Sequence, residues 1–327
     1  MKPFVQTVKG RKQVEEIGFS QCHEHLFLAY GKPAELNEAL HFNDYDKTYQ
    51  EVNELKNNGG TLIVDAQPIG TGRVERKLVR LSTELDIDIV ASTGFHRLDF
   101  YRDDHWIFAY DEAQLADVFI HEAQSGMYVG TEMNFPEQSI YEKAGMIKTA
   151  VSPKGIEERN EKMFLAAAET HRETGLPIMV HNEKGADPFQ VIHFFEKENI
   201  SPEHLLLCHL DRTHHDYRLH EEILQTGAFL EYDTIGRFKY HNDEVEAELI
   251  EHMIEAGFTE QLLMSLDTTR QRLSHYGGEI GLSYLIQTFL PLLRKRGCTE
   301  SIIQQITVKN PQRALRNRLK EAADDET

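Results

Sequence analysis

Cysteine is scarce in this sequence, and long apolar runs are missing. Three cysteines occur among 327 residues, at Cys22, Cys208 and Cys298, and there is no CxxC pair. An odd number of widely spaced cysteines is not expected to form a disulfide framework. No run reaches the ~18 apolar residues that a membrane helix needs, and the first residues lack the basic and then apolar order of a secretion signal. The sequence therefore predicts a cytoplasmic protein without a membrane partner.

Positive charge is also in deficit. The chain has 35 Lys and Arg against 54 Asp and Glu, which gives a formal net charge of −19. Nucleic-acid binding needs Lys and Arg to displace counterions from phosphates, so we expect no nucleic-acid partner. Linkers rich in Pro, Gly or Ser are missing too, and residues 1–327 are expected to form a single domain with a full apolar core. Histidine, with 17 copies, is the abundant residue that needs an explanation.

Short apolar runs alternate with longer amphipathic segments along the chain. This alternation is typical of βα units with a parallel sheet. Eight runs with eight helical partners fit a (β/α)8 barrel, an α/β fold, better than an open doubly wound sheet. The segment TVKNPQRALRNRLKEA, residues 307–322, is predicted to be a C-terminal capping helix outside the repeats. The predicted strands are 17–25, 61–67, 88–94, 144–150, 177–182, 205–211, 228–234 and 262–267.

The first run carries two histidines near its end. In a barrel of this kind the chemistry lies at the carboxyl ends of the strands. His23 and His25 are two residues apart, so both imidazoles can point into the barrel mouth while Cys22 and Glu24 point elsewhere. Two imidazoles on one face can bind a first-row metal ion. The pair alone also fits histidines that only form hydrogen bonds.

Two further runs each end in a single histidine. His181 follows the apolar residues of the fifth run, and His209 follows those of the sixth. One such histidine is usually a hydrogen-bonded core residue, but two at matching positions on consecutive strands favour a metal site. Cys208 precedes His209 and is therefore expected to face the surrounding helices as a small apolar residue.

Lys148 lies within the fourth run, and Asp267 ends the eighth. An ammonium in the apolar surroundings of Lys148 is costly to keep charged, so the amine either pairs with a carboxylate or reacts with carbon dioxide. The resulting carbamate could bridge two cations. Asp267 could bind metal and orient water, and it could also cap a helix before Thr268 and Thr269.

The ordered set His23, His25, Lys148, His181, His209 and Asp267 resembles that of the phosphotriesterase family of the amidohydrolase superfamily. The flanking segments QCHEHLF, AGMIKTAVS, DTTRQRLSHYGG and NPQRAL resemble family segments as well. The resemblance implies two divalent metal ions, most often zinc, and a hydroxide shared between them as the nucleophile. It also implies a possible homodimer, because relatives are often dimers.

The resemblance assigns a role to each of the six residues. His23, His25 and Asp267 would bind the more buried ion, and His181 and His209 the more exposed one. Lys148, carboxylated on its side chain, would bridge both ions. Asp267 would in addition take the proton of the nucleophile and pass it to the leaving group.

The loops after the strands are polar and carry a group of basic residues, which are Lys184, Arg237, Lys239, Arg270 and Arg272. The resemblance to family lactonases implies a lactone as the small-molecule substrate, and the basic residues favour an anionic group on it, so a phosphorylated sugar lactone is the leading hypothesis. Lys239, Arg270 and Tyr276 are the predicted substrate-binding residues. The basic residues could instead pair with acids such as Asp103, Asp187 and Asp243. His96 and His105 are expected to be exposed loop histidines.

Other functions remain open at this point. The same centre could serve a phosphotriesterase or phosphodiesterase, which differs from a lactonase by its substrates alone. The chain could also be a barrel that binds metal without catalysis. A mononuclear deaminase of the same superfamily is a weaker alternative, and it would not need Lys148.

Overall fold

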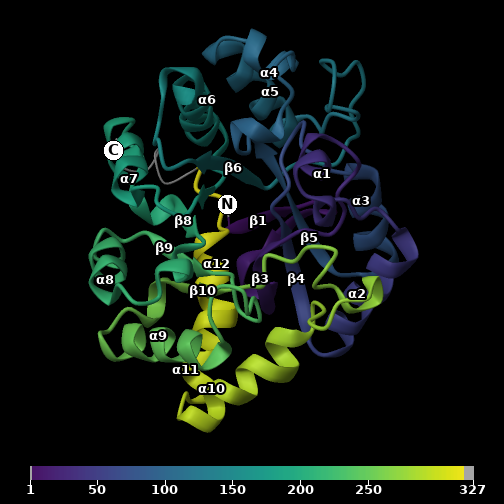
Figure 1. The fold of residues 1–327 in the computed structure, drawn as a ribbon. Coiled ribbons are helices and arrows are strands. Elements are labelled where there is room, and N and C mark those ends of the chain that lie inside the picture. Colours follow the sequence, from purple (N-terminus) through teal and green to yellow (C-terminus); the bar gives the residue numbers. More distant parts are fainter. Residues whose placement is uncertain (1, 320–327) are drawn as a thin grey trace.

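Eight parallel strands wrap into a barrel at the centre of the computed structural model, which describes residues 2–319 (Figure 1). Each strand pairs with the next one in sequence, in the order β10-β9-β8-β7-β6-β5-β4-β3. The predicted (β/α)8 barrel is therefore confirmed. The strands are β3 (Phe19–Glu24), β4 (Gly60–Asp65), β5 (Asp88–Gly94), β6 (Met146–Val151), β7 (Ile178–Asn182), β8 (Leu205–Cys208), β9 (Phe229–Tyr232) and β10 (Leu262–Met264).

The barrel closes between its first strand and the segment after its last strand. The Asp267 amide donates to the His23 carbonyl at 3.1 Å, and the His23 amide donates to the Ser265 hydroxyl at 3.0 Å. The buried Glu24 carboxylate accepts hydrogen bonds from the amides of Leu266 at 2.8 Å and Thr268 at 3.1 Å. These bonds satisfy backbone groups that an open sheet would leave exposed at its edge.

One long helix follows each strand and covers the outside of the barrel. Five of these helices begin after an Asp or Asn whose side chain accepts a hydrogen bond from the first turn, as expected for N-caps. No helix in residues 2–319 is long and apolar enough to cross a membrane. The helices are α2 (Tyr45–Asn57), α3 (Glu75–Leu85), α5 (Glu112–Gln124), α6 (Glu158–Thr174), α7 (Pro188–Lys197), α8 (Tyr217–Gln225), α9 (Asp243–Glu255) and α10 (Leu290–Arg296).

The barrel interior is apolar toward the amino ends of the strands, where Met146, Met179 and Phe229 are buried. Two elements pack against this apolar end of the barrel. One is α12 (Asn310–Ala314), and the other is an antiparallel hairpin that the sequence analysis did not predict, β1 (Phe4–Thr7) with β2 (Gly10–Gln13). Shorter helices complete the fold: α1 (Lys32–Leu36), α4 (Trp106–Ala109) and α11 (Glu300–Gln304). The apolar floor leaves the opposite, carboxyl end of the barrel for polar groups.

The predicted C-terminal capping helix, residues 307–322, extends further than the observed helix. The observed helix stops at Ala314, because the chain then turns to pair with other elements rather than with itself. The Asn317 amide donates to the Phe4 carbonyl at 2.8 Å, and the Arg318 amide donates to the Gly175 carbonyl at 2.9 Å. Residues 320–322 of the predicted helix lie outside the described part of the chain.

Gly94, the last residue of β5, provides a test of the barrel wall. Its φ is +89°, and a Cβ atom there would lie 2.1 Å from the carbonyl oxygen of Lys148. Gly94→Ala should therefore lower the free energy of unfolding by about 3 kcal/mol more than an alanine substitution at a glycine that also has a positive φ but has free space around its Cα atom. Urea titration measures the difference.

Gly257 offers the matched control, with φ +93° and no atom within 4 Å of an added Cβ. Equal losses of stability in Gly94→Ala and Gly257→Ala would contradict close packing at Gly94.

Candidate metal centre

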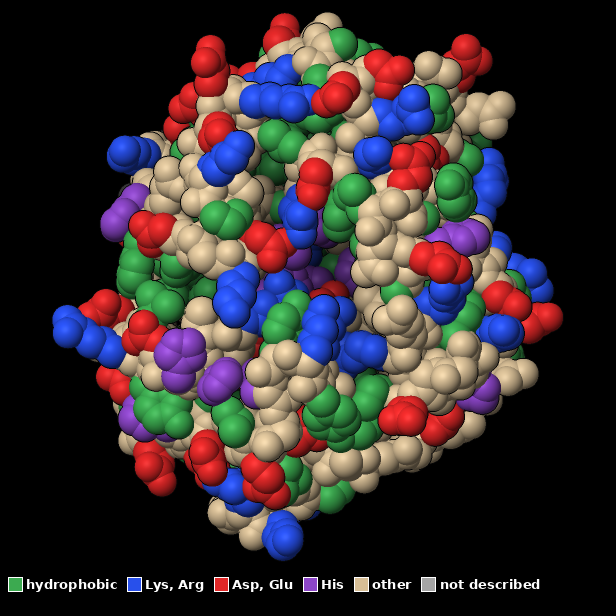
Figure 2. Space-filling view, in the orientation of Figure 1, with side chains coloured by type: hydrophobic (Ala, Val, Ile, Leu, Met, Phe, Trp, Pro, Cys, Tyr) green, Lys and Arg blue, Asp and Glu red, His purple; other side chains and the backbone are tan. Residues whose placement is uncertain are grey.

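The barrel mouth holds a cluster of buried histidines with an aspartate. His23 lies at the end of β3, His25 follows it, and Asp267 follows β10. The Asp267 Oδ1 atom lies 3.7 Å from His23 Nε2 and 3.4 Å from His25 Nε2. Ligand atoms of the three residues lie within 4.8 Å of one another. Figure 2 shows histidine side chains deep in the central hollow of this face, with Lys and Arg around it.

The other three predicted ligands join this cluster. His181 Nδ1 lies 2.8 Å from His209 Nε2, and the His209 ring lies 4.8 Å from the His23 ring between centroids. Lys148, which projects from β6, is fully buried, and its Nζ lies 3.4 Å from His23 Nε2. The structure thus brings together all six residues that the sequence analysis named, from both ends of the chain.

The local backbone differs from the sequence prediction at two of these strands. Cys208 was expected to face the helices, but it packs inside the barrel with Met179 and Leu206. The reason is that β8 ends at Cys208 and His209 adopts a left-handed conformation, φ +68°, which breaks the alternation of side chains. Cys22 also lies in the barrel interior, because the register of β3 shifts between Gln21 and Glu24.

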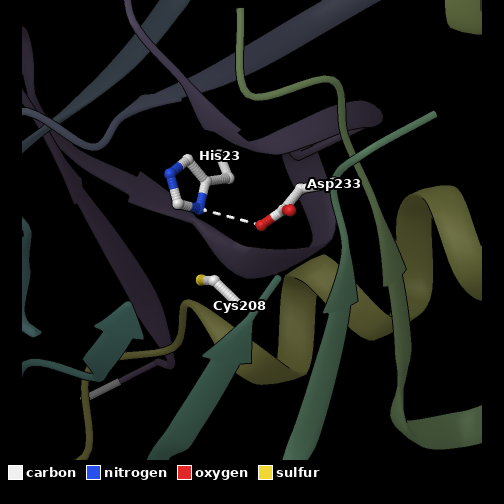
Figure 3. A group of neighbouring side chains, drawn as sticks. All are labelled: His23, Cys208 and Asp233. Atoms are coloured by element: carbon white, nitrogen blue, oxygen red, sulfur yellow. Dashed lines mark ion pairs between the residues drawn. The ribbon is translucent and has the colours of Figure 1, made fainter. Parts of the chain in front are cut away.

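Asp233, at the end of β9, is a site residue that the sequence analysis missed. Its two oxygens face two predicted ligands. One lies 2.7 Å from His209 Nδ1, and the other lies 3.2 Å from His23 Nδ1 (Figure 3). Cys208 projects from β8 into the same interior space, and its sulfur could also approach an ion there (Figure 3). A carboxylate on the far nitrogen of a metal-binding histidine fixes the ring and its tautomer. The position of Asp233 at the end of the seventh predicted strand was the available signal.

Burial sets the protonation states in this cluster. It lowers the pKa of His181 to about 4 and that of His23 well below the ordinary histidine value. Burial alone would raise the pKa of Asp267, but the adjacent Arg237 guanidinium holds that pKa well below its usual range. Neutral imidazoles and an ionised carboxylate are the forms that bind metal ions. Burial also lowers the pKa of Lys148, which favours the free amine.

Unpaired nitrogens indicate that the residues fit a metal ion. The Nδ1 atom of His25 is buried and has no hydrogen-bond partner among the described residues. Four imidazoles, two carboxylates and an amine within one buried cluster leave several lone pairs without protein donors. A divalent cation would satisfy them.

A cavity of about 150 Å³ opens above the cluster. His96 lines it, and its ring lies 5.0 Å from the His181 ring. The expectation that His96 and His105 are exposed is wrong, because both are buried. His105 caps α4, with its Nδ1 accepting from the Ile107 amide at 3.2 Å. His96 was therefore a missed member of the cavity wall.

The basic residues at the mouth differ in their contacts. Arg237 and Arg212 line the cavity and reach the Asp267 carboxylate, with Arg212 Nη2 at 3.6 Å. Arg272 instead donates to the carbonyls of Leu266 and Ile235 and is part of the barrel wall. The acids considered as alternative partners bind elsewhere: Asp103 pairs with Arg159, Asp187 caps α7, and Asp243 accepts from Gly236 and Tyr284.

The three predicted substrate-binding residues do not line the 150 Å³ cavity itself. Lys239 is exposed at its rim and lies over the ring of Tyr240, 4.7 Å from its centroid. Arg270 pairs with the exposed Glu38 at 3.2 Å. The Tyr276 hydroxyl donates to the Asp44 carbonyl at 2.7 Å.

Comparisons of the sequence and of the structure with known proteins agree on one family. The model of the "Phosphotriesterase family" matches residues 3–315. A phospho-furanose lactonase of Mycoplasmopsis synoviae is 31% identical, over 95% of this chain and 91% of the relative. The structure of an amidohydrolase from Mycoplasma synoviae superimposes with a TM-score of 0.92 at 28% identity, covering 97% and 93% of the two chains. That of a lactonase from Listeria monocytogenes gives 0.88 at 26%, covering 96% and 99%.

Asp233 generates a prediction about metal affinity. Asp233→Asn should weaken metal binding by roughly 10- to 100-fold, because His209 and His23 lose the carboxylate that orients them. Titration of the metal-free protein against a competing chelator measures the affinity.

The control is Glu221→Gln, which alters a similar pair outside the barrel, where Glu221 Oε1 lies 2.7 Å from His252 Nε2. If both variants keep the affinity of the unmodified protein, Asp233 does not support metal ligands.

Proposed function

The chain belongs to the phosphotriesterase family, and we propose that it is a binuclear metal-dependent lactonase acting on sugar lactones, phosphorylated ones in particular. Its lactonase relatives support a hydrolase that acts on ester bonds. The observation that carries the proposal is the position of Lys148, fully buried and 3.4 Å from His23 at the centre of the cluster. That position suits a group that bridges two ions.

The six residues divide into two ligand sets around Lys148. His23, His25 and Asp267 would hold the deeper ion, and His181 and His209 the outer one. Carbon dioxide would add to the neutral Lys148 amine, forming an N–C bond and releasing a proton, and the resulting carbamate would supply anionic oxygen ligands in place of the amine. When bound, two ions of the zinc type lower the pKa of water and polarise a carbonyl oxygen.

Asp267 is the residue suited to proton transfer. Its carboxylate is ionised, lies at the cavity floor and contacts Arg237 and Arg212. It can accept the proton of the attacking water and deliver it to the ring oxygen of the lactone as the C–O bond breaks. The arginines keep the carboxylate oriented toward the cavity in both steps.

Cations at the mouth support an anionic substrate. The Tyr240 ring has Arg212, Arg237 and Lys239 within 6 Å of its centroid, at 5.0, 5.9 and 4.7 Å. Asp267 neutralises the two arginines in part, whereas none of the ion pairs within residues 2–319 involves Lys239. A phosphate on the sugar would find its counter-charge there, with Arg270 and Tyr276 as the further predicted contacts.

Lys148→Ala tests the bridged centre. We expect the metal content to fall from about two ions per chain to one or fewer, and lactonase activity to fall by roughly 100-fold or more, since bridging and charge stabilisation are both lost. Elemental analysis of protein purified without chelator gives the ion count.

A suitable control is Lys162→Ala, because Lys162 donates to backbone carbonyls outside the barrel, including that of Phe108 at 2.8 Å. Full activity with an unchanged ion count in Lys148→Ala would favour a mononuclear site. If Asp267→Asn leaves the activity unchanged, the catalytic proposal fails.

Lys239→Met tests the choice of substrate. The ratio of kcat/KM for a phosphorylated sugar lactone to that for its neutral counterpart should fall by roughly 10-fold or more, as for loss of a charged hydrogen bond. Lys197→Met, at the exposed end of α7, is the control and should leave the ratio unchanged.

Neutral phosphotriesters belong in the same assay. Preference for them over both lactones would support the phosphotriesterase alternative. Equal turnover of neutral and phosphorylated lactones by the unmodified protein would contradict the phosphate contact.

A further inference from the structure

A second buried polar cluster lies on the outer side of β9, and we propose that Asp211, His241 and Glu246 form a separate divalent-cation site. Asp211 belongs to the short helix Leu210–Thr213 after β8. His241 lies in the segment between β9 and α9, and Glu246 in the first turn of α9. The proposal does not depend on the function of the barrel mouth.

The three side chains converge closely. One ligand atom from each lies within 4.8 Å of the other two, and His241 Nε2 is 2.9 Å from Glu246 Oε2. Asp211 and Glu246 are fully buried, and His241 is 8% exposed. This arrangement of one imidazole and two carboxylates is a donor set that zinc and similar ions accept.

Some oxygens in the cluster lack donors. The Oδ1 atom of Asp211 and the Oε1 atom of Glu246 have no hydrogen-bond partner among the described residues, while the Oε2 atom of Glu246 is ion-paired with His241. The other Asp211 oxygen accepts from the Thr234 amide at 2.6 Å. Buried carboxylates without donors are costly, so these atoms indicate a missing positive charge.

Neighbouring cations do not supply that charge. Arg212 adjoins Asp211 in sequence, but its guanidinium lies 3.6 Å from Asp267 and 3.7 Å from Glu183, toward the barrel mouth. His241 is therefore the only side chain of the three that can carry a positive charge, and it faces two carboxylates. Burial and the nearby Asp211 raise the pKa of Glu246 to about 8 in the absence of an ion, as expected for two carboxylates buried close together.

Two further side chains with metal-binding atoms lie near the three residues. The Thr234 hydroxyl lies 3.0 Å from His241 Nε2. The His214 ring lies 5.0 Å from that of His241, and its buried Nδ1 has no hydrogen-bond partner among the described residues. Together with the three primary residues, the His214 imidazole would complete the four ligands that a structural zinc ion requires.

An ion here would support the loop that forms one side of the mouth. Asp211 binds the Thr234 amide directly after Asp233, and the segment from Thr234 to His241 carries Arg237 and Tyr240 into the cavity wall. The site would thus join the end of β8 to α9 below this loop. Its loss should affect KM more than kcat, because it holds residues that face substrate rather than the reacting centre.

Crystals grown with zinc test the proposal directly. An anomalous difference map at the zinc edge should contain a peak between Asp211, His241 and Glu246, about 2.0–2.2 Å from the ligand atoms. A map with peaks at the barrel mouth but none in this cluster would overturn the proposal. A peak here and none at the mouth would support it while contradicting the proposed function.

Ion counting provides a second test. Glu246→Gln should bind one zinc ion fewer per chain than the unmodified protein, with the ions of the mouth retained and KM raised several-fold. Glu248→Gln, exposed on the same helix, should match the unmodified protein. An unchanged ion count in Glu246→Gln would overturn the proposal, and if this variant does not fold, the anomalous map decides alone.

Discussion

Closure of the barrel between β3 and the segment after β10 is the constraint on which the candidate site depends. The hydrogen bond from the Asp267 amide to the His23 carbonyl joins two predicted metal ligands that are far apart in the sequence. Glu24 strengthens the same junction by accepting from two amides and the Thr268 hydroxyl. Burial raises the pKa of Glu24 to about 7, and its hydrogen bonds oppose that rise. The geometry of His23, His25 and Asp267 is therefore a property of the closed ring.

Much of this arrangement could be predicted from the sequence because each strand carries a local signal. The apolar runs indicated every barrel strand, and polar residues in or just after five of these runs indicated the six candidate ligands that the structure brings together. The strand ends were less accurate: the run 205–211 yields a strand of only Leu205–Cys208. Periodicity cannot show where a strand stops if the following residues remain apolar and buried, as Leu210 does.

The errors at Cys208 and His96 have physical causes of different kinds. Side-chain alternation holds only while the backbone stays extended, and His209 leaves that conformation at φ +68° without a glycine to signal it. His96 lies in a long polar segment, and polar composition favours an exposed loop. Its ring contacts Phe100, four residues later, and also His181, which is distant in sequence and could not be anticipated from the local composition. Neither outcome is encoded in a local pattern.

Backbone strain coincides with the candidate ligands. His209 and Asp267 are two of only four described residues other than glycine with positive φ, and both lie where a strand ends at the mouth. Such conformations persist where surrounding contacts fix them, and here Asp233 holds the His209 ring while Arg237 holds the Asp267 carboxylate. Without an ion these contacts maintain a buried group of unpaired donors and acceptors that is unfavourable by itself. The fold therefore provides a preformed site, and metal binding would recover part of the free energy spent in assembling it.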